Sequence, residues 1–329
     1  MGEKCKVSVL CTAYNHEKYI RDALEGFVSQ RTDFPFEVLV NDDCSSDGTA
    51  DIIREYAGKY PDIIRPFYQE KNLYSQGGMT HLFASVFYPN ARGEYMALCE
   101  GDDYWSDPEK LQRQVSFLDA HPDYTACVHN TVLHYCDGSA PDAALRPEGQ
   151  GDRDVDFNTV VNGPSGSFHT SSILARREYI VDPPDFHYTA AAHGFTDYAI
   201  GLWLALNGKI RFIDRSMSVY RIASNPAAWS AKLGAHYARL KEFIVGELAM
   251  MEKLLPHLNE EQAAVTKKVM RERRYELLYI EGKVDELVKP PFDEIFRAKP
   301  LKYRMTVTVK RMFPALHRLY RKRRGYEDY

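Results

Sequence analysis

The segment VSVLCTAYNHEKYIRDALEGFVSQ, residues 7–30, decides the fold that the sequence predicts. It opens with the apolar run Val7–Thr12, which is typical of a buried strand. Apolar residues then recur at i, i+4, i+7 and i+8, which places them on one face of a helix; they are Ile20, Leu24, Phe27 and Val28. A strand followed by an amphipathic helix is the first half of a parallel βαβ unit.

The same alternation continues along the chain. Further strands are expected at residues 36–40, 63–68, 95–99, 126–135, 167–175, 210–213 and 217–221. Helices are expected around Ile52–Tyr56 and at residues 82–88, Leu111–Leu118 and 196–206. Ser106 or Asp107 would cap the helix that contains Leu111–Leu118. Residues 137–156 are rich in Gly, Pro, Asp and Arg, as in a loop. Residues 230–288 are helical in pattern, with an interruption near Pro256.

These elements predict an α/β fold with a doubly wound, mostly parallel sheet flanked by helices. We assign the sheet to a domain over residues 1–229, followed by a helical extension over 230–294. A basic amphipathic tail completes the chain over 295–329.

Composition narrows the class of protein. The 329 residues include 44 % hydrophobic and 27 % charged residues, as in a globular domain with a sizeable core. The longest apolar patch, Ala199–Leu206, is too short to cross a bilayer, and no signal-peptide pattern precedes Val7. Six cysteines without CxxC spacing are expected to be buried thiols rather than disulfide partners or zinc ligands. These features favour a cytoplasmic location.

Polar clusters follow three of the expected strands. Thr12-Ala13-Tyr14-Asn15 follows the first, Asn41–Thr49 with Asp42 and Asp43 follows the second, and Glu100-Gly101-Asp102-Asp103 follows the fourth. Ligands of open α/β sheets bind at the carboxyl ends of the strands. Adjacent carboxylates repel one another unless a cation is present, and Mg²⁺ or Mn²⁺ would relieve that repulsion. Alternatively, both acidic clusters form solvated turns or helix caps.

Four segments together resemble the glycosyltransferases of family 2, which have the GT-A fold. They are residues 7–30 and 36–53, GEYMALCEGDDYWSDPEKLQRQVSFL at 93–118, and TDYAIGLWLALNGKIRFIDRSMSVYR at 196–221. The order and spacing are most similar to bacterial enzymes of capsule, lipopolysaccharide and O-antigen biosynthesis. The resemblance covers about residues 5–230.

The resemblance implies a role for each matched residue. Thr12, Ala13, Tyr14 and Asn15, with Asp42 and Asp43, would bind the uracil and ribose of a UDP-sugar. Glu100, Gly101, Asp102 and Asp103 occupy the place of the acidic DxD motif, where Asp102 and Asp103 would hold the metal ion, Mn²⁺ or Mg²⁺. Arg221 would contact the diphosphate, and Asp197 would be the general base of an inverting transfer.

Two departures from the family pattern affect the metal. The first Asp of the acidic motif is Glu100 here, and Ile222-Ala223-Ser224-Asn225 replaces the segment where many relatives carry a metal-binding His. The metal would then have fewer protein ligands, or His169 or His193 would substitute. Each of these histidines can equally be a structural residue.

Asp197 also has a second interpretation, as a cap for the helix that begins with Tyr198. For the whole protein, two other classes are alternatives: a catalytically silent sugar-nucleotide-binding or scaffold protein, and a nucleotidyltransferase. The latter needs a Gly-rich, Arg-containing loop after the first strand, and TAYNHEKY at 12–19 is not such a loop.

The tail differs in charge from the rest of the chain. Residues 295–326 contain eleven Lys or Arg and no acid, whereas residues 1–294, with 31 basic and 44 acidic residues, carry a formal charge of −13. Apolar residues interleave with the cations. This pattern predicts contact with the anionic inner face of the membrane, consistent with a glycan acceptor on a lipid. A solvated terminal helix or an oligomer contact would show the same pattern; binding of nucleic acid is not expected.

Overall fold

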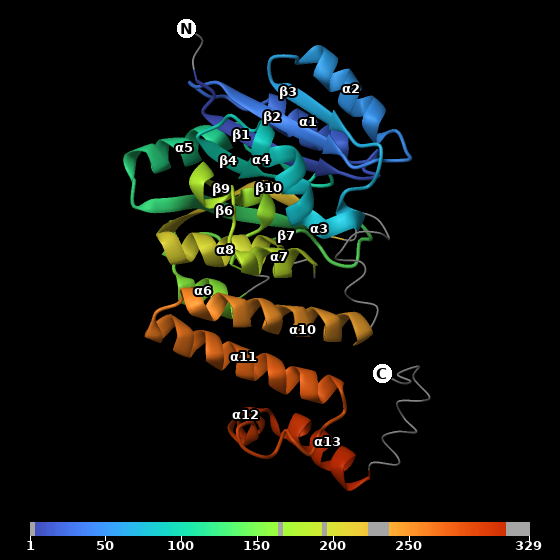
Figure 1. Ribbon diagram of the computed structural model, residues 1–329, viewed down its shortest axis with the longest axis vertical. Coiled ribbons are helices and arrows are strands. Elements are labelled where there is room, and N and C mark those ends of the chain that lie inside the picture. Colours follow the sequence, from blue (N-terminus) through green and yellow to red (C-terminus); the bar gives the residue numbers. More distant parts are fainter. Residues whose placement is uncertain (1–3, 164–166, 193–195, 223–236, 314–329) are drawn as a thin grey trace. The chain divides into compact units, whose positions relative to one another are not determined.

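The computed structural model describes residues 4–163, 167–192, 196–222 and 237–313 (Figure 1). The chain divides into two compact units, residues 1–231 and 232–329. The first is α/β and contains a ten-stranded sheet with the strand order β3-β2-β1-β4-β9-β6-β10-β5, in which β7 pairs with β6 and β8 with β10. The described part of the second is helical.

The N-terminal half of the sheet is parallel. It contains β1 (Val7–Ala13), β2 (Phe36–Asp42), β3 (Ile64–Tyr68) and β4 (Tyr95–Leu98). Strand β1 lies between β2 and β4, and β3 pairs with the other side of β2. The register of β1 and β2 sets Val7 opposite Phe36 and Ala13 opposite Asp42, so both strands end level with one another. Helix α1 (Ile20–Val28) connects β1 to β2, and helix α2 (Thr49–Lys59) connects β2 to β3.

The other half inserts antiparallel strands. Strand β9 (Leu174–Arg176) lies between β4 and β6 (Tyr124–Tyr135) and is antiparallel to both, so β6 runs in the direction of β4. Strand β10 (Lys209–Ile222) is parallel to β6. The short strands β5 (Tyr104–Trp105), β7 (Ala143–Ala144) and β8 (Arg153–Val155) are antiparallel additions. The expected mostly parallel α/β sheet is confirmed.

Helices complete the first unit. They are α3 (Tyr74–Leu82), the π-helical turn η1 (Phe83–Phe87), α4 (Tyr88–Asn90), α5 (Lys110–Ala120), α6 (Phe157–Asn162), η2 (Thr170–Ser172), η3 (Arg177–Tyr179), α7 (Asp185–Ala192) and α8 (Thr196–Asn207). The second unit contains α10 (Tyr237–Leu254), the 3₁₀ turn η4 (Leu255–His257) at the expected interruption, α11 (Glu260–Ile280), α12 (Asp293–Ala298) and α13 (Leu301–Met312). No helix among the described residues is long and apolar enough to span a membrane.

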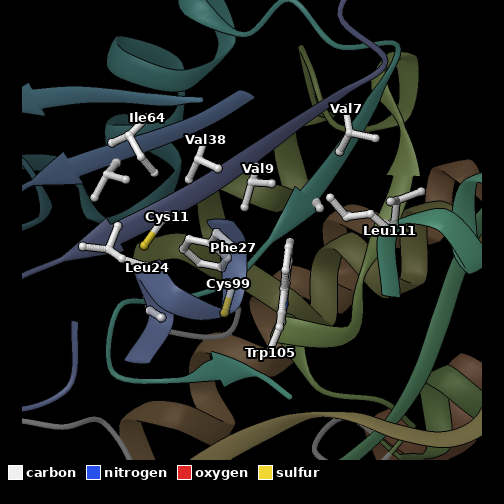
Figure 2. Close-up of a cluster of buried hydrophobic side chains, with 14 of the residues drawn as sticks. Val7, Val9, Cys11, Leu24, Phe27, Val38, Ile64, Cys99, Trp105 and Leu111 are labelled. Atoms are coloured by element: carbon white, nitrogen blue, oxygen red, sulfur yellow. The ribbon is translucent and has the colours of Figure 1, made fainter. Parts of the chain in front are cut away.

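A hydrophobic core supports the carboxyl edge of the parallel strands (Figure 2). The apolar stripe of α1 is buried, including Leu24 and Phe27. Phe27 contacts Trp105 of β5 edge to face, with ring centroids 4.8 Å apart. Cys11 and Cys99, labelled in this view, are buried free thiols as expected, and so is Cys127. The expected burial is wrong for Cys44 and Cys136, which are free but exposed.

Three local predictions are wrong. The strand expected over 167–175 is reduced to β9, because the His169 and Ser172 side chains bond to backbone and form the turn η2 instead. The strands expected at 210–213 and 217–221 form one strand, β10, since register shifts between Ile213 and Ser218 accommodate the interruption. Neither Ser106 nor Asp107 caps α5, which begins at Lys110; Asp107 accepts a hydrogen bond from Glu109 N (2.9 Å) in the preceding turn.

The loop expected over 137–156 also contains secondary structure. The two-residue strand β7 and the start of β8 lie within it. Both are additions to longer strands, β6 and β10, and such short edge pairings leave no periodic signal in the sequence.

Candidate active site

Three loops meet at the carboxyl edge of β2, β1 and β4. They follow Asp42, Ala13 and Leu98, and these strands are adjacent and parallel. Backbone hydrogen bonds join the loops to the central strand: Gly101 N donates to Thr12 O (2.8 Å) and Asp43 N donates to Ala13 O (2.8 Å). The polar clusters that the sequence placed after three strands therefore lie side by side at one edge of the sheet.

Asn15 fixes the loop after β1 against the loop after β2. Its backbone is left-handed, with φ of 56°, a conformation that Asn tolerates better than most residues. Its Oδ1 accepts a hydrogen bond from Ser46 N (2.8 Å), and its N–H donates to Ser45 Oγ (2.9 Å). Tyr14, in contrast, is 44 % exposed, so its ring is accessible to a ligand.

The acidic pair Asp42-Asp43 divides into two different environments. Asp43 accepts hydrogen bonds from Leu73 N (2.7 Å) and Tyr74 N (3.0 Å), so both its oxygens hold the start of α3. Asp42 accepts a hydrogen bond from Ser45 N (3.3 Å) through Oδ2, whereas its buried Oδ1 has no partner in the described structure. Asp42 therefore has an oxygen left for a ligand, while Asp43 is occupied by the helix.

The acidic segment 100–103 concentrates negative charge in a buried place. Burial, together with Asp102 and Asp197, raises the pKa of Glu100 to about 8. Burial, together with Asp102 and Glu100, also raises the pKa of Asp103 well above its ordinary value. Asp103 accepts a hydrogen bond from Arg221 N (2.9 Å) through Oδ1, but its Oδ2 is buried without a hydrogen bond among the described residues.

Arg221 borders this segment from the end of β10. Its guanidinium donates to Asp102 O (2.9 Å), pairs with Asp22 on α1, and lies 4.5 Å from the ring centre of Tyr104. The side chain is thus already engaged by protein groups. Asp22 and Tyr104 were not identified from the sequence, because only the tertiary fold brings α1 and β5 to the end of β10.

Asp197 lies in the first turn of α8, and the fold brings it to the acidic segment. Its Oδ1 accepts a hydrogen bond from the N–H of the next residue, Tyr198 (2.8 Å). Since α8 begins at Thr196, Asp197 lies within the helix, and the expectation that it caps a helix beginning with Tyr198 is wrong. Burial raises its pKa above the ordinary value, and its charge contributes to the raised pKa of Glu100. A carboxylate in the first turn of α8 that is close enough to Glu100 to raise its pKa can act as a base beside the acidic segment.

His169 also lies beside the acidic segment. Its Nδ1 is 3.8 Å from Asp103 Oδ2 and 2.9 Å from Ser171 Oγ, and its ring stacks on Tyr220 with centroids 4.1 Å apart. Burial lowers its pKa to about 4, so the imidazole is neutral at pH 7. Ser171 N donates to Nδ1 (3.3 Å), which orients that nitrogen toward the turn η2. His193 lies outside the described residues.

The residues present fit a hard divalent cation. The described residues contain no group of three or more His, Cys, Asp or Glu side chains arranged around a metal position. Asp103 Oδ2 is nevertheless a buried carboxylate oxygen without a hydrogen bond, beside the further acids Asp102 and Glu100. Oxygen ligands from one or two carboxylates are what Mg²⁺ takes from a protein when substrate phosphates supply the rest.

The family model described as glycosyl transferase family 2 matches residues 8–180, more than half of the chain. The chain belongs to this family. The match spans the three loops at the carboxyl edge and ends before Asp197 and Arg221.

Relatives of this family 2 chain extend the comparison. It is 40 % identical to an uncharacterized protein of Mycobacterium tuberculosis over 216 aligned residues. This alignment covers 65 % of the chain and 58 % of that relative. The chain thus spans less than two thirds of that relative's length. It is 34 % identical over 124 residues to the putative glycosyltransferase EpsE of Bacillus subtilis, covering 38 % of the chain and 42 % of EpsE.

Solved structures share the fold of this family 2 chain. Staphylococcus aureus TarS, residues 1–349 in complex with UDP, superposes with a TM-score of 0.57 at 19 % identity, covering 90 % of this chain and 76 % of that one. The mannosyltransferase PcManGT of Pyrobaculum calidifontis, in complex with GDP-Man and Mn²⁺, gives 0.53 at 16 % identity, with 98 % and 83 % covered. These likenesses confirm the GT-A fold.

Proposed function

We propose that this family 2 chain is an inverting glycosyltransferase that moves a sugar from a UDP-sugar to a hydroxyl of a glycan acceptor. The observation that carries the proposal is the convergence of Asp197 with the acidic segment 100–103 at the edge where the loops after β1 and β2 also end. The residues proposed for the nucleotide, the metal and the proton transfer would therefore act at one edge of the sheet.

Thr12, Ala13, Tyr14 and Asp42 would bind the nucleoside. The exposed Tyr14 ring offers a surface for the base, and Asp42 Oδ1, which has no hydrogen-bond partner among the described residues, offers an acceptor for a base N–H or a ribose hydroxyl. Asn15 and Asp43 would act by holding these loops in place, because their side chains already bond to backbone. The choice of UDP is supported by TarS, which was solved with UDP and with UDP-GlcNAc.

Asp102 and Asp103 would hold a divalent metal ion, Mn²⁺ or Mg²⁺, and Glu100, Gly101 and Arg221 would surround the diphosphate. When bound, the metal supplies Lewis-acid stabilisation of the negative charge on the leaving diphosphate. Two protein carboxylates and the substrate phosphates suffice for such a cation.

Asp197 would be the general base. Its carboxylate accepts the proton of the acceptor hydroxyl as that oxygen forms a bond to the anomeric carbon. The bond from that carbon to the diphosphate oxygen breaks, its electron pair leaves with UDP, and the configuration inverts. Burial raises the pKa of Asp197, which makes the carboxylate a stronger base than an exposed aspartate. General-base assistance typically contributes ~10²–10⁴-fold to the rate.

The acceptor is proposed to be a lipid-linked glycan of cell-surface polysaccharide synthesis, met at the inner face of the cytoplasmic membrane. The printed names of relatives support this class: TuaG of B. subtilis is a putative teichuronic acid biosynthesis glycosyltransferase, and TarS of S. aureus is a poly(ribitol-phosphate) β-N-acetylglucosaminyltransferase. Their products differ, so the sugar and linkage are not assigned.

Turnover with variants tests the proposal. Purified protein would be incubated with UDP-sugars, Mn²⁺ and a lipid-linked glycan fraction, and released UDP would be measured. We expect Asp197→Asn to retain UDP affinity while losing ~10²-fold or more in turnover, and Asp102→Ala to lose metal-dependent UDP binding. If Asp197→Asn lost UDP affinity instead, Asp197 would belong to the donor site. UDP binding without turnover on any acceptor would favour a silent sugar-nucleotide-binding protein.

A further inference from the structure

Helix α13 in the second unit has one face packed and one face exposed. Val307 is fully buried in a small core with Tyr275 and Leu287, and Tyr303 packs against the same core. Lys310 Nζ donates to Tyr279 OH (3.0 Å) from this side of the helix. At about 100° per residue, Tyr303, Val307 and Lys310 form a single inward face.

The opposite face of α13 carries large apolar side chains in solvent. We call it the α13 stripe: Leu301, Met305, Val309 and Met312, which are 64 %, 59 %, 56 % and 67 % exposed. Their spacing of four, four and three residues aligns them along one side of the helix. Phe313, directly after the helix, is 50 % exposed. Exposed apolar side chains gathered on one face mark an interaction surface, whereas singly scattered ones are ordinary.

Cations flank the stripe. In helical projection, Lys302 follows one border of the stripe and Arg304 lies toward the other. The sequence from residue 295 to residue 326 has no acidic residue at all and eleven basic ones. Arg311 donates from Nε to Asp285 (2.9 Å) and Arg297 pairs with Asp293, so two of these cations are neutralised within the unit, but the segment as a whole remains strongly positive.

We infer that the α13 stripe binds an anionic lipid surface, with Leu301, Met305, Val309 and Met312 among the acyl chains and the flanking cations at the headgroups. Charge complementarity favours lipid over a second copy, because stripe-to-stripe pairing would bring two acid-free, basic segments together. An apolar centre bordered by Lys and Arg is the arrangement of helices that lie in the membrane interface. The inference deepens the proposed function, since it names the surface by which a lipid-linked acceptor would be approached, but its test needs neither donor nor acceptor.

The test is sedimentation of the full chain with vesicles. We expect binding to phosphatidylcholine vesicles that contain about 30 % phosphatidylglycerol, and much weaker binding to phosphatidylcholine alone, since each basic residue near an anionic surface contributes about 1 kcal/mol. Raising NaCl to about 0.5 M should weaken binding by screening.

Two variants with the same charge change separate apolar insertion from charge alone. Met305→Glu places a carboxylate in the stripe, whereas Thr306→Glu places it on the same helix next to the stripe, at an exposed residue. We expect Met305→Glu to lower the vesicle partition coefficient at least ~10-fold and Thr306→Glu to lower it only about 2–5-fold, the electrostatic part. Circular dichroism and thermal melting check that both variants keep the helical unit.

Three results would overturn the inference. They are failure of the unmodified chain to bind anionic vesicles, equal losses in the two variants, and a wild-type dimer that Met305→Glu converts to a monomer while vesicle binding is unchanged. The last result would assign the α13 stripe to a second copy of the chain. None of these outcomes bears on UDP binding or on turnover with a soluble acceptor, so the proposed function is tested separately.

Discussion

Lys110 provides the sharpest test of the core beneath the acidic segment. The side chain is fully buried at the start of α5, where its Nζ donates to Gln114 Oε1 (2.7 Å) and lies 4.1 Å from the ring centre of Trp105. Burial lowers its pKa from 10.5 to about 7. Since one pKa unit corresponds to ~1.4 kcal/mol, protonated Lys110 costs the folded state roughly 5 kcal/mol relative to the unfolded chain.

The sign of the pH dependence follows from the two pKa values. Between about pH 7 and 10.5 the unfolded chain keeps the Lys110 proton and the folded chain does not, so the free energy of unfolding rises with pH in this window. Below about pH 7 both states are protonated and the full cost remains. From about pH 8 to 9.5, Lys110 should add ~2 kcal/mol to the free energy of unfolding, at up to ~1.4 kcal/mol per pH unit.

Lys110→Met should remove this increment while keeping an unbranched side chain against Trp105. It also leaves Gln114 Oε1 without its donor, a cost of ~1–3 kcal/mol that is independent of pH. The readout is therefore the difference in slope between wild type and variant in urea unfolding followed by tryptophan fluorescence. The exposed Lys18→Met is the control, and its slope should match wild type. Parallel curves for wild type and Lys110→Met would refute the assignment of a neutral buried lysine.

Two further predictions concern the elements that carry the loops. Gly26→Ala should destabilise the fold by ~1–3 kcal/mol, because a Cβ at residue 26 would lie 2.7 Å from Trp105 O. Gly58→Ala is the control and should be neutral or stabilising by up to ~1 kcal/mol, because a Cβ at residue 58 would meet no described atom within 4 Å. Urea unfolding measures both variants, and equal effects would contradict the close packing of α1 on β5. Asp43→Ala should raise the rate of amide hydrogen exchange at Leu73 and Tyr74 at least ~10-fold, since both N–H groups lose their carboxylate acceptor. Exchange rates in α5 serve as the internal reference. Unchanged exchange rates at Leu73 and Tyr74 would show that Asp43 does not hold α3.

Much of the fold could be predicted because its signals are local. The strand and helix within residues 7–30 follow from apolar spacing, and the helix around 196–206 from its apolar run and the Asn207-Gly208 stop. The antiparallel insertion of β9 could not be predicted, because its pairing with β4 and β6 depends on contacts far apart in sequence. Helix α3 kinks at Gly77 and Gly78, where Gly78 has a φ of 70°, a left-handed conformation that glycine adopts readily.

The sequence predicted which loops form the site, but not which hydrogen bonds each side chain makes there. Strand-end position identified Asp42, Asp102 and Asp103, because parallel strands present their carboxyl ends at one edge. The same rule cannot distinguish Asp42, which has one oxygen without a partner in the described part of the chain, from Asp43, whose oxygens both hold α3. Nor does it find Asp22 beside Arg221, since that ion pair joins α1 to the end of β10.

We propose above that the carboxyl edge of β1, β2 and β4 is a metal-assisted UDP site. Calorimetric titration of UDP into wild type and Asp103→Asn, each with and without Mn²⁺, tests it most directly. We predict that Mn²⁺ strengthens UDP binding to wild type at least ~10-fold, or about 1.4 kcal/mol, and that Asp103→Asn loses this dependence because its Oδ2 carboxylate oxygen is gone. UDP binding that is absent, or equally tight with and without Mn²⁺ in both proteins, would contradict the claim.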